Sequence, residues 1–132
     1  LVAQKDEIYS ALALYYIIDN NLLKEKTKVN KLFDDVIKMQ SEKEIENLII
    51  YKKGLYNSET SSENELLDIL NPVIKSNSIW KSHALLLMSN YFVSKGDALK
   101  AKSFLEEIIQ IENANNDIKI EAQRKIKREF SD

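Results

Sequence analysis

Apolar residues recur three and four positions apart along most of this chain, which is the spacing of amphipathic helices. In the first segment, for example, Ile8, Leu12 and Tyr15 fall on one helix face. No stretch has the alternation of a convincing strand. The predicted helices span Val2–Asp19, Leu22–Gln40, Ser41–Gly54, Glu63–Leu70, Ile79–Lys95, Asp97–Glu112 and Asp117–Phe130. The pattern therefore predicts an all-α protein of about seven helices.

Residues at the segment ends support these boundaries. Ser41 with Glu44 three positions later has the pattern of a capping box. Other predicted N-terminal caps are Ser61 or Ser62, the run 76–78, Asp97 and Asp117. A helix break is predicted at Asn20-Asn21, and residues 22–27 could form a turn instead of the start of the next helix. Because Pro72 follows, the helix that begins at Glu63 should end or kink near Asn71, with Val73 and Ile74 as a last packed turn.

The clearest segment is Ile79–Ile111, in which two helices flank a tight turn. Gly96 can adopt the positive φ that ends the first helix, and Asp97 can accept hydrogen bonds from the amides that begin the second. Similar helix starts recur at roughly 38 residues, within the range of helical repeats. We therefore expect one domain, 1–132, of stacked antiparallel helical hairpins. Its best-formed repeat is 79–112 and its C-terminal capping helix is 117–130.

Residues 85–108 resemble a tetratricopeptide repeat. The matching positions are Leu85, Met88, Ser89 and Phe92 in the first helix, Gly96 in the turn, and Ala101, Leu105 and Ile108 in the second helix. The chain departs from that pattern at its first position, where Leu85 replaces Trp, and at its end, where Asn113 replaces Pro. The resemblance implies a superhelix of hairpins with a concave surface formed by the first helix of each pair.

The longer pattern Trp80-x-x-x-Ala84 followed by Gly96-Asp97-x-x-x-Ala101 is similar to the tetratricopeptide-like family of the ancillary subunit of the bacterial Sec translocon. That resemblance implies a transmembrane anchor before the repeats and repeats that face the periplasm. It also implies a translocon component or periplasmic chaperone as partner. A start at Leu1 suits a removed anchor, so the location implied by the resemblance is the bacterial inner membrane with this domain in the periplasm; the alternative is the cytoplasm.

Composition narrows the function further. The net charge of −2 leaves no excess of cations to neutralise phosphates, so a nucleic-acid partner is not expected. The chain has no cysteine, which excludes disulfides, thiolate metal sites and cysteine nucleophiles. No apolar run approaches the roughly 18 residues of a membrane span.

Residues suited to catalysis are few. His83 is the single histidine, and no spacing of histidines and carboxylates forms a metal-binding motif. Paired carboxylates such as Asp34-Asp35 and Glu106-Glu107 fall on amphipathic helices, where they face water. We therefore predict no catalytic residue, no metal, no cofactor and no enzymatic activity.

Candidate binding residues lie on the first helix of each predicted hairpin. Aromatic residues on the concave surface of stacked repeats often contact partner peptides, so Tyr9, Tyr16, Tyr51 and Tyr91 are candidates. The alternative is that these tyrosines fill the core with their hydroxyls at its rim. The resemblance to the repeat adds four further groove positions: His83, Leu86, Asn90 and Ser94.

Two functions are compatible with such a scaffold. The first is a non-enzymatic protein-interaction module that captures a protein or peptide partner, in the periplasm and linked to secretion or chaperone traffic. The alternative is a structural helical-repeat domain that forms a homodimer through an end hairpin, for which the helix at Val2–Ile18 is a candidate.

Overall fold

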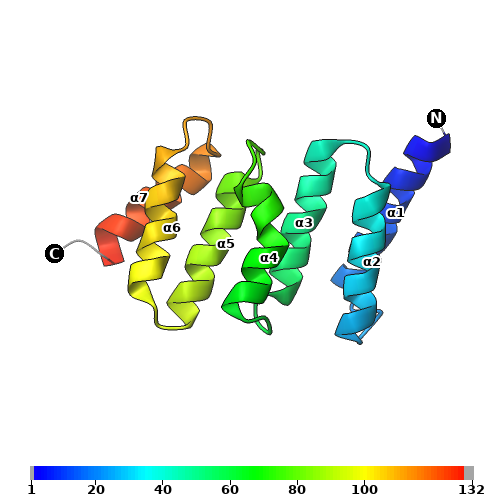
Figure 1. Cartoon of the computed structure of the whole chain (residues 1–132), viewed down its shortest axis with the longest axis horizontal. Coiled ribbons are helices and arrows are strands. Elements are labelled where there is room, and N and C mark those ends of the chain that lie inside the picture. Colours follow the sequence, from blue (N-terminus) through cyan, green and yellow to red (C-terminus); the bar gives the residue numbers. More distant parts are fainter. Residues whose placement is uncertain (1, 130–132) are drawn as a thin grey trace.

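The computed structural model describes residues 2–129, and within that range the chain is all-α with no strand. Figure 1 shows the helices in sequence order along one axis, with α1 and α7 at opposite ends. The predicted fold class is therefore confirmed. The helices are α1 (Val2–Asp19), α2 (Lys26–Met39), α3 (Lys43–Asn57), α4 (Glu63–Ile74), α5 (Lys81–Ser94), α6 (Ala98–Gln110) and α7 (Asn116–Glu129).

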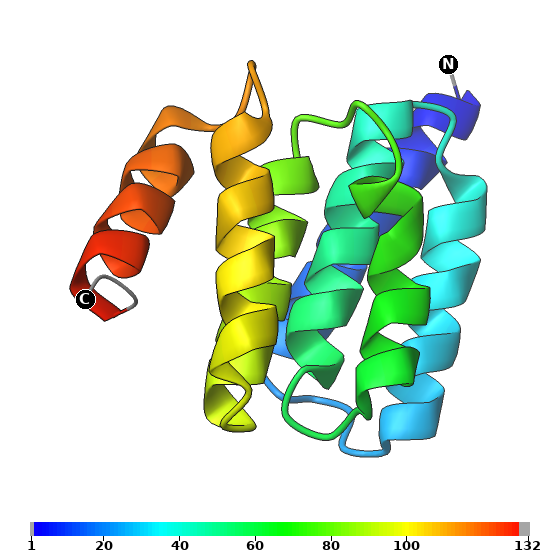
Figure 2. The same cartoon turned by 60° about the vertical axis from the view of Figure 1, so that its left-hand side comes forward.

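Consecutive helices pack as antiparallel hairpins, α1 with α2, α3 with α4 and α5 with α6, and α7 covers the last pair (Figure 2). Three clusters of buried apolar side chains overlap along this stack: one joins α1, α2 and α3, the next joins α3 to α6, and the last joins α5, α6 and α7. Each helix contacts only near neighbours in the chain. Stability is therefore distributed along the stack in the manner of repeat proteins.

Several predicted boundaries are confirmed. The Ser62 side chain accepts from the Glu65 amide, and the Glu65 carboxylate accepts from the Ser62 amide, which completes a capping box at the start of α4. Gly96 has a φ of 78°, and the Asp97 carboxylate accepts from the Lys100 amide. At the crossing of α5 and α6, Ala101 is fully buried and its carbonyl accepts from the Ser89 hydroxyl.

The capping box predicted at Ser41 is wrong. The N-cap of α3 is Glu42, whose side chain makes no capping hydrogen bond. The Ser41 hydroxyl instead donates to the Glu7 carboxylate of α1, at 3.0 Å. The Glu44 carboxylate is used by a segment more than thirty residues further along the chain. Both residues thus form tertiary contacts that replace the local pair.

Glu44 holds the loop between α4 and α5 against the first turn of α3. Its carboxylate accepts from the Ile79 amide and the Ser78 hydroxyl, both at 2.7 Å, and from the Asn47 side-chain amide at 2.9 Å. The hydrogen bonds from Ile79, Ser78 and Asn47, in that order, lower the pKa of the Glu44 carboxyl. The charged form is therefore the one that stabilises this junction.

We expect Glu44→Gln to lower the free energy of unfolding by about 1 kcal/mol at pH 7, because the carboxylate is partly solvated and hydrogen bonds to a charged group weaken in water. The matched control is Glu46→Gln, which removes only a surface pair with Lys43 and should cost at most about 0.5 kcal/mol.

The effect of Glu44 should depend on pH. Since the folded pKa lies below the ordinary glutamate value of 4.5, the stabilisation is complete above that value and is lost as the pH falls through the folded pKa. Urea unfolding of the native protein and Glu44→Gln at pH 7 and pH 3 tests this. If the native protein and Glu44→Gln differ in free energy of unfolding by the same amount at both pH values, the proposed role of the charge is contradicted.

α3 and α4 end later in the chain than Gly54 and Asn71, and Val73 and Ile74 form the last packed turn of α4 that the sequence predicted. α3 continues past Gly54 to Asn57, and α4 continues through Pro72 to Ile74. Pro72 cannot donate to the carbonyl of Asp68, but both residues are exposed, so water can satisfy that carbonyl. Val73 is fully buried, and its packing holds the last turn of α4 in place.

The remaining differences are at single turns. Residues 22–25 precede α2 as non-helical chain, which agrees with the turn considered there, and Asn21 after α1 has a φ of 50°. α5 begins at Lys81 and not at Ile79, and α6 ends at Gln110. Asn115, not Asp117, caps α7 by accepting from the Ile118 amide. The predicted continuation to Phe130 lies outside the described residues.

Candidate protein-binding surface

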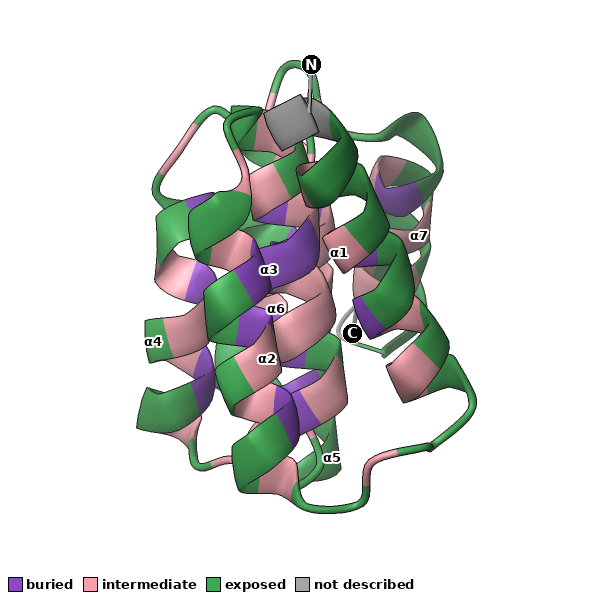
Figure 3. Ribbon diagram, turned by 90° about the vertical axis from the view of Figure 1, so that its right-hand side faces the viewer, coloured by how far each residue is buried: buried purple, intermediate pink, exposed green. Residues whose placement is uncertain are grey.

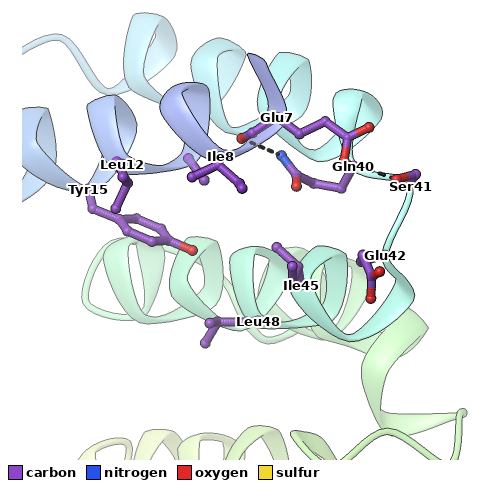
Figure 4. Close-up of a pocket in the computed structure, with 10 residues that line it drawn as sticks. Glu7, Ile8, Leu12, Tyr15, Gln40, Ser41, Glu42, Ile45 and Leu48 are labelled. Carbon is purple, nitrogen blue, oxygen red and sulfur yellow. Dashed lines mark hydrogen bonds between the residues drawn. The ribbon is translucent and has the colours of Figure 1, made fainter. Parts of the chain in front are cut away.

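An apolar groove of about 460 Å³ lies between α1 and α3, at the end of the stack that Figure 3 presents to the viewer. The close-up in Figure 4 shows its two helical walls and the α2–α3 loop that closes one end. Its lining residues are Glu7, Ile8, Ala11, Leu12, Tyr15, Gln40, Ser41, Glu42, Ile45 and Leu48.

Large apolar side chains form the walls of this groove. Ile8 and Leu12 of α1 are each 55% exposed, and Ile45 of α3 is 39% exposed. Leu48 lies below Ile45 on the same helix and is half-buried (Figure 4). Such a concentration of exposed aliphatic groups in a concavity is typical of sites that bind apolar ligand surface.

The closed end of the groove is polar and fixed by hydrogen bonds. Gln40 donates to the Val36 carbonyl at 3.0 Å and to the Glu7 carbonyl at 3.4 Å, and the Ser41 hydroxyl donates to the Glu7 carboxylate (Figure 4). These bonds tie the α2–α3 loop to α1. Glu7 and Glu42 give this end two acidic side chains.

Tyr15 lies between α1 and α3 and joins this groove to a second hollow of about 270 Å³. The ammonium of Lys52 lies 4.6 Å from the centre of the Tyr15 ring, and Asp19 and Leu55 line the second hollow. Burial raises the pKa of the Tyr15 hydroxyl, which has no hydrogen-bond partner among the described residues. A ligand in the groove could supply the missing partner.

The structure separates the eight predicted binding residues into four places. Tyr9 and Tyr16 are on α1, 65% and 63% exposed, but neither lines the groove. Tyr51 and His83 belong to an aromatic cluster with Trp80. The ring centroids are 6.2 Å apart for Tyr51 and Trp80 and 4.8 Å apart for Trp80 and His83.

Desolvation lowers the pKa of His83, and its Nδ1 is buried without a hydrogen-bond partner among the described residues. The ring packs against both Tyr51 and Trp80 as part of the contact between α3 and α5. Trp80 and His83 therefore contribute to the packing at this contact.

Asn90, Tyr91 and Ser94 line a hollow of about 430 Å³ beside the ends of α3 and α5. Their polar groups already have partners: Tyr91 donates to the Ser61 carbonyl, Ser94 donates to the Tyr91 carbonyl, and the Lys125 ammonium donates to Asn90. Tyr91 itself is buried, and Leu86 packs with the cluster between α5 and α7.

The groove residues Leu12, Ile45 and Leu48 are not among the sequence-based candidates. One signal is present in the sequence, because residues 8–18 of α1 contain no charged side chain and are apolar on nearly every face. A helix that is apolar all round has more than one face to cover. The periodicity does not say which faces the neighbouring helices leave open.

Comparisons of the chain with protein-family models, with curated proteins and with solved structures find no match. The tetratricopeptide and translocon resemblances therefore remain predictions. Among the described residues, no helix has the length and apolar character needed to cross a membrane. The same residues contain no group of three or more His, Asp or Glu side chains that could hold a metal ion.

Proposed function

We propose that this chain is a non-enzymatic protein-interaction scaffold whose α1–α3 groove binds an apolar segment of a partner polypeptide. The observation that carries the proposal is the groove itself, a concavity of about 460 Å³ with aliphatic walls from two helices. A volume of this size accommodates two or three large apolar side chains.

A polypeptide fits the shape of the site better than a compact small molecule does. The groove and the second hollow share Tyr15, so together they follow the boundary between α1 and α3 over several helical turns. An elongated segment can place successive side chains along such a track, as helices do in hydrophobic grooves. Glu7 and Glu42 favour Lys or Arg at the closed end, since complementary charge sets orientation and specificity.

Selection from a displayed library of random peptides tests the proposal. We expect enrichment of peptides with two or three large apolar residues and a basic residue at one end. Ile45→Glu should reduce the affinity of a selected peptide at least about tenfold, because it places a charge in the apolar wall. The matched control is Ile120→Glu in α7, a residue of similar exposure that lies outside the groove.

Both variants should melt at the native temperature, since both positions are partly exposed. A library with no enriched peptide contradicts the proposal. It is also contradicted if the selected peptides bind Ile45→Glu and the native protein with equal affinity.

The cellular partner in this proposal is a translocon component or a periplasmic chaperone, as the sequence resemblance implies, with the domain facing the periplasm. The supporting residues are Trp80, Ala84, Gly96, Asp97 and Ala101, and their contacts are all explained by helix packing and capping. The pair of variants at Ile45 and Ile120 supplies the test. Cross-linking in membranes should capture a secretion component with the Ile120→Glu control and not with Ile45→Glu.

A further inference from the structure

The outward face of α1 has a regular stripe of residues that no described helix covers. Lys5, Tyr9, Leu12, Tyr16 and Asp19 follow one another at intervals of four, three, four and three residues. All five are exposed, and Figure 3 shows α1 as the end helix of the stack with this face toward solvent. Alternating intervals of three and four form the contact seam of paired helices.

The two ends of this stripe carry opposite charges, Lys5 at one end and Asp19 at the other, so the stripe is complementary to an antiparallel second copy of itself. Leu12 is its midpoint, seven residues from both Lys5 and Asp19, or about 10.5 Å along the helix in each direction. If the stripe is rotated by 180° about Leu12, Lys5 meets Asp19 and Leu12 meets itself, and Tyr9 comes to within one residue of Tyr16, about 1.5 Å along the helix axis. Neither Lys5 nor Asp19 makes an ion pair with another described residue.

We propose that α1 is a homodimerisation helix that pairs antiparallel with α1 of a second copy, with the two-fold axis at Leu12. Two Lys5–Asp19 ion pairs flank two contacts between Tyr9 and Tyr16, and the two Leu12 side chains meet at the centre. A parallel pair would instead place Lys5 against Lys5 and Asp19 against Asp19. The charges therefore select the antiparallel orientation.

Further residues on α1 are compatible with this pairing. The same rotation places Asp6, beside the stripe, at the level of the uncharged Ile18 of the second copy. Ala13 is exposed next to Leu12, and its small side chain permits close approach of the two helices. Such a contact is isologous, since each copy presents the same surface, and it closes at two chains.

The size of the contact predicts a weak dimer. A helix of 18 residues is about 27 Å long, and one pair of such helices buries less than the roughly 800 Å² per partner of a standard interface. We expect a dissociation constant above about 1 μM, with exchange between monomer and dimer.

The proposed dimer seam is distinct from the groove that carries the proposed function. Of the five stripe residues, only Leu12 also lines the α1–α3 groove. Tyr9 and Tyr16 do not line it, so a substitution at Tyr9 tests the dimer without altering the groove wall. Conversely, the substitution Ile45→Glu alters the groove wall and leaves the α1 stripe unchanged.

Sedimentation equilibrium of the whole chain from about 0.5 μM to about 1 mM, at low salt, tests the proposal, since this range begins below the smallest expected dissociation constant. The native protein should show a monomer–dimer equilibrium, and Tyr9→Glu should weaken it at least about tenfold because Glu meets Tyr16 of the second copy. Leu99→Glu is the control, since Leu99 is 83% exposed on α6 and should leave the equilibrium unchanged. A strict monomer at the highest concentration overturns the proposal, as does a dimer that Tyr9→Glu does not weaken.

Charge exchange tests the orientation. Lys5→Asp and Asp19→Lys should each weaken the dimer about tenfold, because each converts two attractive pairs into repulsive ones. The double variant restores attraction and should return to within about threefold of the native constant. Equal weakening in the double variant and the single variants overturns the antiparallel register. Circular dichroism of every variant checks that the fold is retained.

Discussion

Replacing Phe33 by Ala is expected to lower the free energy of unfolding by about 3–5 kcal/mol, the cost of removing a large buried aromatic side chain. Phe33 is fully buried in α2, within the cluster that joins α1, α2 and α3, and its ring lies 5.8 Å from that of Tyr56. The loss should loosen α1 as well, since α1 packs on the rest of the described chain mainly through α2.

Thermal and urea unfolding measure this effect, and a fall of about 10–20 °C in melting temperature is expected for a domain of this size. Leu99→Ala is the control, because Leu99 is exposed and its loss should cost less than about 0.5 kcal/mol. Hydrogen exchange should accelerate more in α1 and α2 than in α6, which belongs to other clusters. A loss below about 1 kcal/mol contradicts the assigned packing.

Gly54→Val is expected to lower the free energy of unfolding by about 2 kcal/mol, although valine forms helices better than glycine. A Cβ atom at Gly54 would lie 2.6 Å from Cδ2 of Leu70 and 3.3 Å from Cδ2 of Leu87. Leu70 is fully buried and cannot move into solvent. Gly54 is thus a position at which α3 approaches α4 and α5 closely, and overpacking outweighs the gain in helix propensity.

A double-mutant cycle identifies the cause. Leu70→Ala alone should cost about 2–5 kcal/mol, but it also creates the space that a valine side chain at position 54 needs. The double variant should therefore be more stable than the sum of the two single losses predicts, by at least about 1 kcal/mol. Strict additivity would show that the two side chains do not compete for the same space.

The local sequence is sufficient to predict the helices and some of their ends. Periodicity, Ser62 with Glu65, and Gly96 with Asp97 act within one or two turns, so their structural effect can be read from neighbouring residues. The prediction fails where a local signal competes with a distant partner. Glu44 accepts from residues 34 and 35 positions away, and Ser41 donates to a residue 34 positions away.

The surroundings of the candidate binding residues are predicted least well for the same reason. Their position on the first helix of a hairpin predicts that Tyr9 and Tyr16 line a concave groove, yet they lie on the outward face of α1. Trp80 and His83 pack together with Tyr51 of another helix. The position of an aromatic residue on a helix is set by the sequence, but its neighbours are set by how the helices cross.

By itself, the sequence determined that the chain is all-α, that its helices form consecutive antiparallel hairpins, and that α1 is apolar on several faces. Only the tertiary structure decided which of those faces is covered. α2 covers the side of Ala11 and Leu14, α3 diverges to leave a groove beside Ile8 and Leu12, and the face of Tyr9 remains open. The physical reason is the distance along the sequence over which each effect acts. Helix formation depends on residues up to about four positions apart, whereas the separation of α1 from α3 depends on side chains about 30 residues apart.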